Sequence, residues 1–152
     1  MVKPKKHLGQ HFLKDQNIAQ KIVECLNANF ENVVEVGPGT GILTEPLLNR
    51  IPKLKLLSLV EIDSESVEYL KDNFNDPRLH IYEDNFLKMN IRNVTTEEFS
   101  LIGNFPYNIS SQILFKVIEN RTQISQVVGM IQKEVAEQWV MQQLQVEILP
   151  QQ

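Results

Sequence analysis

The chain has 152 residues, of which 42% are hydrophobic and 22% are charged, and its formal net charge is −4. This length and composition are typical of one soluble globular domain with a sizeable core, and the single Cys25 excludes an internal disulfide. Because the sequence has no apolar run of about 18 residues and no basic-then-apolar leader, we expect neither a membrane span nor a secretory signal, and therefore a cytoplasmic protein.

Hydrophobic periodicity predicts helices and strands in alternation along the chain. The predicted helices are residues 15–29, 43–51, 63–74 and 113–118, and the predicted strands are residues 32–37, 54–62, 78–82, 99–105 and 126–131. Asp15 and Asp63 are the expected N-caps of the first and third helices. Such alternation predicts an α/β fold with a doubly wound, mostly parallel sheet that carries helices on both faces.

The last stretch, "AEQWVMQQLQVEILPQQ", has a looser pattern and many glutamines. It predicts a helix with a frayed end and no further strand. On this reading the edge of the fifth strand is left open.

A glycine cluster, "EVGPGTG", follows the first predicted strand, at the place where a doubly wound fold puts its first strand-to-helix turn. Its residues Glu35, Gly37, Gly39 and Gly41 are candidate cofactor-binding residues, because glycines allow the backbone to approach a ligand closely. A dinucleotide fingerprint would need another small residue at Ile42, so the spacing disfavours NAD. The turn indicates a nucleotide-like cofactor.

Two carboxylates follow the next two predicted strands. Glu61 lies about 20 residues beyond the glycines, where a carboxylate can accept both hydroxyls of a ribose. Asp84, in "YEDNF", follows the third strand on the same edge of the sheet, where it could accept from an adenine amino group. Each also has a plainer interpretation, Glu61 as a solvated strand end and Asp84 as a turn former.

The segment "NFPY", residues 104–107, ends the fourth predicted strand on this same edge. The side-chain oxygen of Asn104 and the carbonyl of Phe105 could accept the two hydrogens of an exocyclic amine, which would aim the amine's lone pair at an electrophilic methyl group. Pro106 would stiffen the turn, and Tyr107 offers a ring on which an extruded base can stack. These four residues are the candidate catalytic residues, and in-line positioning would supply most of the acceleration.

Five motifs in register resemble the small-subunit ribosomal RNA adenine dimethylases. They are "GQHFLKDQNIAQKI", "VVEVGPGTGILT", "LVEID", "EDNFL" and "IGNFPYNIS", and the resemblance runs from about residue 5 to residue 135. It implies a Rossmann-like class I methyltransferase fold that uses S-adenosylmethionine. It also implies N6,N6-dimethylation of two adjacent adenosines in a small-subunit (16S) rRNA hairpin loop, during small-subunit biogenesis.

The resemblance also implies cofactor contacts at His11 and Leu13, with Gln10 closing over the same pocket. It places further contacts at Gly37, Glu61, Asp84 and Asn104. His11 replaces the more common Asn, and whether its side chain or its backbone makes the contact stays open. Phe105 replaces the more usual Leu. Because the expected contact is made by the backbone carbonyl, the exchange should leave that contact unchanged.

We divide the chain into a basic arm and cofactor-lid segment (1–14), a methyltransferase domain (15–137) and a divergent tail (138–152). In the family the chain continues beyond "QKEVAEQ" with further strands and a small helical domain, which we expect to be missing here. The basic residues of the arm could be a solvated tail or could contact RNA. We expect a monomer whose partner is small-subunit rRNA or the 30S precursor particle, with no membrane partner. We expect no metal site, because the pair His7 and His11 has no third ligand nearby.

Three alternatives stay open. A related group, the large-subunit rRNA adenine dimethylases of the macrolide-resistance type, shares the glycine turn, the acidic strand end and the Asn-x-Pro-Tyr segment. The chain could instead be a non-catalytic RNA-binding module. It could also be a fragment that does not fold well.

Overall fold

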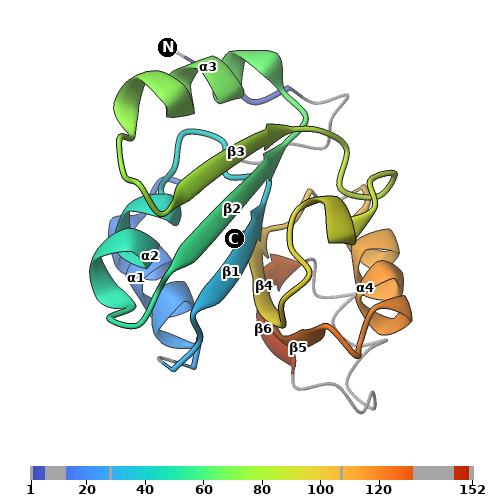
Figure 1. Ribbon diagram of the computed structural model, residues 1–152. Coiled ribbons are helices and arrows are strands. Elements are labelled where there is room, and N and C mark those ends of the chain that lie inside the picture. The colour runs from blue at the N-terminus through green and yellow to red at the C-terminus, as the bar shows by residue number, and fades with distance from the viewer. Residues whose placement is uncertain (1, 6–12, 28, 107, 132–145, 151–152) are drawn as a thin grey trace.

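The structure is a computed structural model that describes residues 2–5, 13–27, 29–106, 108–131 and 146–150 (Figure 1). Its strands are β1 (Asn32–Val36), β2 (Leu56–Glu61), β3 (Leu79–Glu83), β4 (Phe99–Asn104), β5 (Ile124–Ile131) and β6 (Val146–Pro150). Its helices are α1 (Gln16–Glu24), α2 (Thr44–Arg50), α3 (Ser64–Asn73) and α4 (Ser110–Glu119), with a short 3-10 helix η2 (Ile91–Asn93).

The strands form one six-stranded sheet in the order β3-β2-β1-β4-β5-β6, and neighbouring strands are parallel. The chain moves outward from β1 to β3 in one direction and from β4 to β6 in the other. The reversal falls between β1 and β4, and open sheets of this kind bind ligands at such a switch point, beyond the carboxyl ends of the strands.

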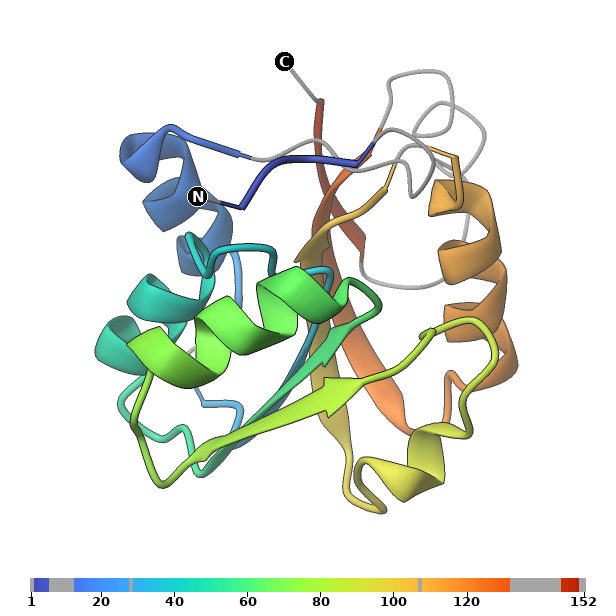
Figure 2. The same ribbon diagram turned by 90° about the horizontal axis from the view of Figure 1, so that it is seen from above.

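Helices cover both faces of the sheet, as the sequence predicted. Seen from above, α1, α2 and α3 lie on one side of the strands, and α4 and η2 lie on the other (Figure 2). Alternate residues of each strand supply two separate hydrophobic cores. Val33 and Leu57 pack on the α1 side, whereas Val34 and Leu101 pack on the α4 side.

The predicted caps are confirmed. The Asp15 carboxylate accepts from the backbone N–H groups of Asn17 and Ile18, at 2.8 and 3.3 Å. The Asp63 carboxylate accepts from the backbone N–H of Ser66 at 3.2 Å. Helix α1 ends at Glu24, earlier than the predicted residue 29.

The expectation for the C-terminal stretch was wrong. Residues 146–150 form β6, which pairs in parallel with β5 from Val127↔Val146 to Ile131↔Pro150. The backbone groups along an open strand edge attract a further strand whatever its side-chain pattern, so a weakly patterned segment can pair there. The remainder of the predicted helix, residues 136–145, lies outside the described residues.

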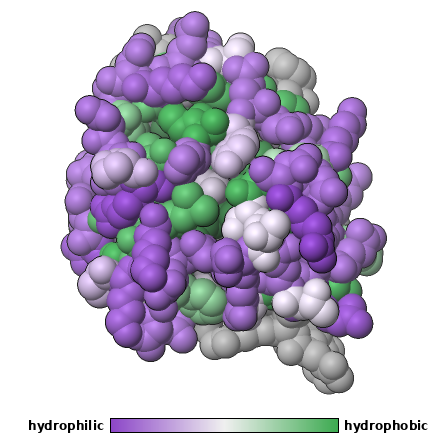
Figure 3. Space-filling view, in the orientation of Figure 1, coloured by the Kyte–Doolittle hydropathy of each residue, from purple (hydrophilic) through white to green (hydrophobic). Residues whose placement is uncertain are grey.

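The opposite edge strand, β3, is only half-buried. Figure 3 views the molecule from the side on which β3 crosses in front, and apolar side chains gather toward the middle of an otherwise polar surface. Among the described residues, no helix has both the length and the apolar character needed to cross a membrane.

Candidate functional site

The carboxyl ends of β1 and β4 meet at a small pocket. It is lined by Leu13, Glu35, Gly37, Pro38, Gly39, Thr40, Ile42, Leu43 and Asn104. We call this the edge pocket. It brings together the glycine turn after β1, the buried Glu35 of that strand and the amide of Asn104 that ends β4, although Glu35 and Asn104 are 69 positions apart in the sequence.

The glycine turn needs its glycines for backbone reasons. Gly37, Gly39 and Gly41 have φ values of 66°, 58° and 86°, a region that residues with a Cβ rarely adopt. At Gly41 space is also short, since a Cβ would lie 2.5 Å from the ring of Phe74 at the end of α3. Gly41 therefore packs closely against the end of α3, while Gly37 and Gly39 line the edge pocket.

Glu61 anchors the glycine turn through a backbone hydrogen bond. One carboxylate oxygen accepts from the backbone N–H of Gly39 and the other from that of Asp63, both at 2.9 Å, and the residue is only 2% exposed. Burial raises the pKa of the Glu61 carboxyl, and the backbone hydrogen bonds oppose that rise. A carboxylate can accept at about four positions, so the Glu61 carboxylate retains capacity to accept from a ligand hydroxyl beside these backbone bonds.

Glu35 is a buried carboxyl that, unlike Glu61, lines the edge pocket itself. Its Oε1 accepts from the Thr44 hydroxyl at 2.7 Å, and Thr44 is the first residue of α2. Burial raises the pKa of Glu35 to about 8, against the effect of the Thr44 hydrogen bond and with a smaller upward contribution from Glu61. At neutral pH this carboxyl is mostly protonated.

The segment after β4 is held at both ends. Phe105 donates its backbone N–H to the Met130 carbonyl at 3.2 Å. The Pro106 carbonyl accepts from the backbone N–H of Ile109 at 3.1 Å and from the Ser110 hydroxyl at 3.0 Å. These bonds tie the predicted catalytic segment to β5 on one side and to the start of α4 on the other.

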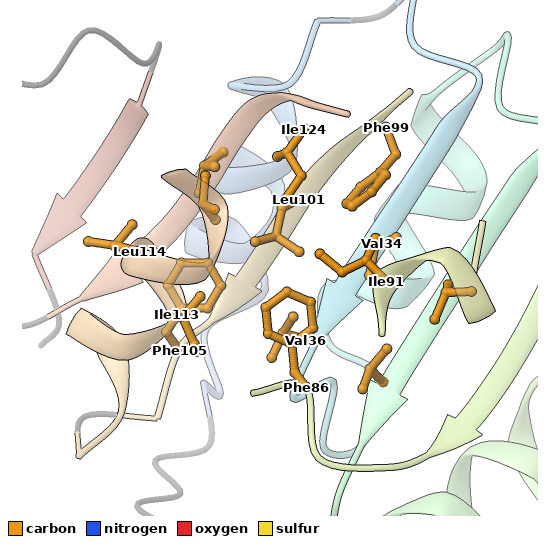
Figure 4. Packing of buried hydrophobic residues seen from close by; sticks show 14 of the residues in the cluster. Val34, Val36, Phe86, Ile91, Phe99, Leu101, Phe105, Ile113, Leu114 and Ile124 are labelled. Carbon is orange, nitrogen blue, oxygen red and sulfur yellow. The ribbon is translucent and has the colours of Figure 1, made fainter. Parts of the chain in front are cut away.

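The ring of Phe105 belongs to the core and is 1% exposed. It covers Gly103 and Gly129, which are paired in register on β4 and β5, and a Cβ on either glycine would lie within 3.0 Å of the ring. Figure 4 shows this ring beside Ile113 of α4, within the buried cluster. Only the backbone of Phe105 is therefore placed to serve a ligand.

Asp84 lies beside Glu61, as the strand order requires. Its backbone N–H donates to the Glu61 carbonyl at 3.1 Å, and its carboxylate accepts from the backbone N–H of Asn85 at 2.7 Å. Asp84 is exposed and does not line the edge pocket itself.

One contact near the site was missed from the sequence. The ammonium of Lys5 lies 3.0 Å from the Asp63 carboxylate and 3.1 Å from that of Glu65, at the start of α3. Burial acts to raise the pKa of Asp63, but the hydrogen bonds from Lys5 and Ser66 outweigh it and hold that pKa below its usual range. The clustered charges indicated a basic arm. They could not indicate that Lys5 pairs with Asp63, because the two residues are 58 positions apart in the sequence.

The remaining predicted site residues divide into two groups. Leu13 lines the edge pocket, as expected. Gln10, His11 and Tyr107 lie outside the described residues. Within the described part of the chain, no group of three His, Cys, Asp or Glu side chains could hold a metal ion.

A family model described as ribosomal RNA adenine dimethylase matches residues 1–143. The chain belongs to the ribosomal RNA adenine dimethylase family. This finding confirms the family that the five motifs indicated.

Two curated relatives illustrate the match. The chain is 50% identical over 140 residues to the ribosomal RNA small subunit methyltransferase A of Cytophaga hutchinsonii, covering 91% of this chain and 54% of the relative. It is 52% identical over 139 residues to the protein of that name from Bacteroides thetaiotaomicron, covering 90% and 51%. The chain thus spans about half the length of the curated relatives it matches.

Solved structures share the fold of this rRNA adenine dimethylase family member. A proposed RNA methyltransferase from Pyrococcus horikoshii has a TM-score of 0.72 at 19% identity, over 91% of this chain and 71% of that chain. DesVI of Streptomyces venezuelae has a TM-score of 0.55 at 11% identity, over 75% and 49%. At such identities the likeness shows the fold alone, which is the Rossmann-like methyltransferase fold expected from the sequence.

Proposed function

We propose that this chain is the cofactor-binding and catalytic part of an S-adenosylmethionine-dependent rRNA adenine N6,N6-dimethyltransferase. Its substrate would be two adjacent adenosines in a hairpin loop of small-subunit (16S) rRNA. The observation that carries the proposal is the edge pocket, where Asn104 meets the glycine turn whose backbone is bonded to the buried carboxylate of Glu61.

The residues at this edge fit the cofactor that methyltransferases of this family and fold generally use. The glycine turn lets the backbone approach a ligand, and Glu61 retains lone pairs for the two ribose hydroxyls. Asp84 would accept from the adenine amino group. Leu13 would contribute an apolar contact, and Gln10 and His11 would complete the pocket. When bound, S-adenosylmethionine supplies an electrophilic methyl group on a sulfonium centre.

The amine of the target adenine would be oriented by Asn104 and Phe105. The Asn104 side-chain oxygen and the Phe105 carbonyl would accept its two hydrogens and turn its lone pair toward the methyl group. The bonds that hold this segment to β5 and α4 support such a role, since positioning requires a rigid frame. Tyr107 would stack on the extruded base, and Pro106 would stiffen the turn between them.

The names of the relatives favour the small-subunit substrate over the large-subunit alternative. Methylation of isolated 30S precursor particles, compared with protein-free large-subunit rRNA, separates the two. We further propose that the protein acts as a monomer in the cytoplasm, without a metal ion.

Calorimetric titration of the 152-residue chain with S-adenosylmethionine tests the proposal. We expect a cooperative thermal melt and saturable binding near one site per chain. A folded chain that binds no cofactor would contradict the proposal. Methyl transfer to 30S particles then tests the reaction, and cofactor binding without any transfer would favour the non-catalytic alternative.

A further inference from the structure

The loop that follows Asp84 is built as a single helical turn. The backbone N–H groups of Lys88 and Met89 both donate to the Asn85 carbonyl at 3.0 Å, and the Asn85 side chain accepts from the backbone N–H of Leu87 at 3.0 Å. A single turn leaves its last carbonyls without partners inside the turn. These carbonyls therefore need a donor from elsewhere in the molecule.

Lys116 of α4 supplies that donor. Its ammonium donates to the carbonyls of Phe86 and Met89 and lies 4.8 Å from the centre of the Phe86 ring. A cation at the C-terminal end of a helical turn is favourable both for its hydrogen bonds and for the peptide dipoles, and the face of an aromatic ring also attracts it.

Phe86 ties this turn to the core. The residue is buried in the α4-side cluster with Val36, Ile91 and Phe105, as Figure 4 shows. The ring of Phe86 is thus held by the sheet on one side and lies under the ammonium of Lys116 on the other. The turn that begins next to Asp84 has little freedom to shift while both contacts persist.

The carboxylate of Asp84 also acts on the same ammonium through space. Burial lowers the pKa of Lys116, while the carboxylates of Asp84 and Glu119 act in the opposite direction. Asp84 also accepts from the backbone N–H of Asn85, the first residue of the turn. A displacement of the turn would therefore move Asp84.

Helix α4 carries Lys116 in a fixed relation to the catalytic segment. The Ser110 hydroxyl at the start of the helix donates to the Pro106 carbonyl at 3.0 Å, and Ile113 and Leu114 pack against the sheet. Lys116 thus joins the loop after β3 to the helix that follows residues Asn104–Pro106.

We propose that Lys116 is a positioning residue that holds the loop after β3 so that Asp84 meets the adenine of the cofactor. This inference rests on the proposed function, because it takes Asp84 as the acceptor for the adenine amino group. The proposed role gives the site a further residue, carried by α4 on the opposite face of the sheet from α1, α2 and α3. Lys116 would act without touching the cofactor.

Calorimetric titration of the full chain with S-adenosylhomocysteine tests this role. We expect Lys116→Met to weaken binding about tenfold, the scale at which loss of an orienting group usually weakens a site. Lys116→Arg, which keeps donors and charge, should recover most of the affinity. Lys88→Met is the matched control, because it removes an exposed lysine from the same loop.

A second readout distinguishes positioning from a general loss of structure. If Lys116 acts through Asp84, the Lys116→Met variant should discriminate less between S-adenosylhomocysteine and S-inosylhomocysteine, which lacks the amino group. Adding Lys116→Met to Asp84→Asn should then cost little further affinity, whereas independent effects would add.

The outcomes separate this inference from the proposed function. Failure of the wild-type chain to bind either ligand would overturn both. Normal binding by wild type with unchanged affinity in Lys116→Met, or additive losses in the double variant, would overturn only the role of Lys116. A Lys116→Met variant without a cooperative melt would assign Lys116 to folding and would also overturn it.

Discussion

The backbone N–H of Gly39 donates to the carboxylate of Glu61 at 2.9 Å, which joins the glycine turn after β1 to the end of β2. The same carboxylate accepts from Asp63 at the start of α3. A single buried side chain therefore orders two backbone segments of the site and retains lone pairs for a ligand.

Glu61→Ala should weaken S-adenosylmethionine binding by at least about tenfold, since hydrogen bonds to a charged group contribute about 1.5–3 kcal/mol each. Asn104→Ala should abolish methylation while changing the dissociation constant far less. Calorimetry and a methylation assay on 30S particles measure the two effects. Glu83→Ala is the control, because Glu83 stands beside Glu61 in the sheet register but is exposed. Equal losses of affinity in the Glu61 and Asn104 variants would contradict this division of roles.

The stability of the protein should fall as pH rises toward the alkaline range. Burial raises the pKa of Glu35 from 4.5 to about 8, so between these values the folded state holds a proton that the unfolded state releases. The stabilisation is complete below about pH 4.5 and is lost progressively as pH approaches and passes 8. Glu35→Gln should remove much of this slope in the free energy of unfolding, measured by urea denaturation at several pH values.

Glu61, whose pKa burial also raises, should contribute to the slope in the same direction. Glu68→Gln is the control, since Glu68 is exposed on α3. A wild-type protein whose stability increases steadily from pH 5 to pH 8, on the scale of about one kcal/mol or more, would show that Glu35 is ionised in the folded state.

Gly129→Ala should destabilise the fold by about 1–3 kcal/mol, the usual cost of overpacking a core. The new Cβ would lie 2.6 Å from the Phe105 ring and 2.9 Å from the Gly103 carbonyl oxygen. Phe105→Leu should recover part of the loss by removing the ring contact, though not the contact with the backbone oxygen. Chemical denaturation of the two single variants and the double variant measures the coupling, and strictly additive effects would show that the ring does not restrict this position.

Tyr107→Ala should weaken capture of the target base, because stacking of one base on an aromatic ring contributes about 1–3 kcal/mol. The expected result is a higher KM for 30S particles with nearly unchanged S-adenosylmethionine binding. Because the ring of Phe105 is buried in the core, it offers no alternative platform. A fully active Tyr107→Ala variant would show that stacking on Tyr107 is not part of the mechanism.

The structure also shows how the core accommodates the ring of Phe105. The resemblance implies that Leu is more usual at the position of Phe105, and the paired glycines Gly103 and Gly129 leave room for the larger ring. The sequence showed the exchange but not the space, because the two glycines lie on different strands and only the register brings them together.

Much of the fold could be predicted from local pattern. Apolar runs identified β1 to β5, and the caps Asp15 and Asp63 placed two helix starts correctly. The order of strands then put Glu61, Asp84 and Asn104 at one edge, because the carboxyl ends of parallel strands share an edge. The strand β6 was missed, since its pairing comes from an open neighbouring edge and its own residues lack a clear alternation.

The sequence by itself determined the family, the alternation of helices and strands and the residues that carry the proposed chemistry, because periodicity and motif spacing act between near neighbours. Only the tertiary structure decided which groups these residues meet. The Thr44 hydroxyl on Glu35, the Lys5 ammonium on Asp63 and the Lys116 ammonium on the loop after Asp84 all join different elements. Such partners are chosen by the packing of the sheet and its helices, and that packing also buries Glu35 and sets its pKa.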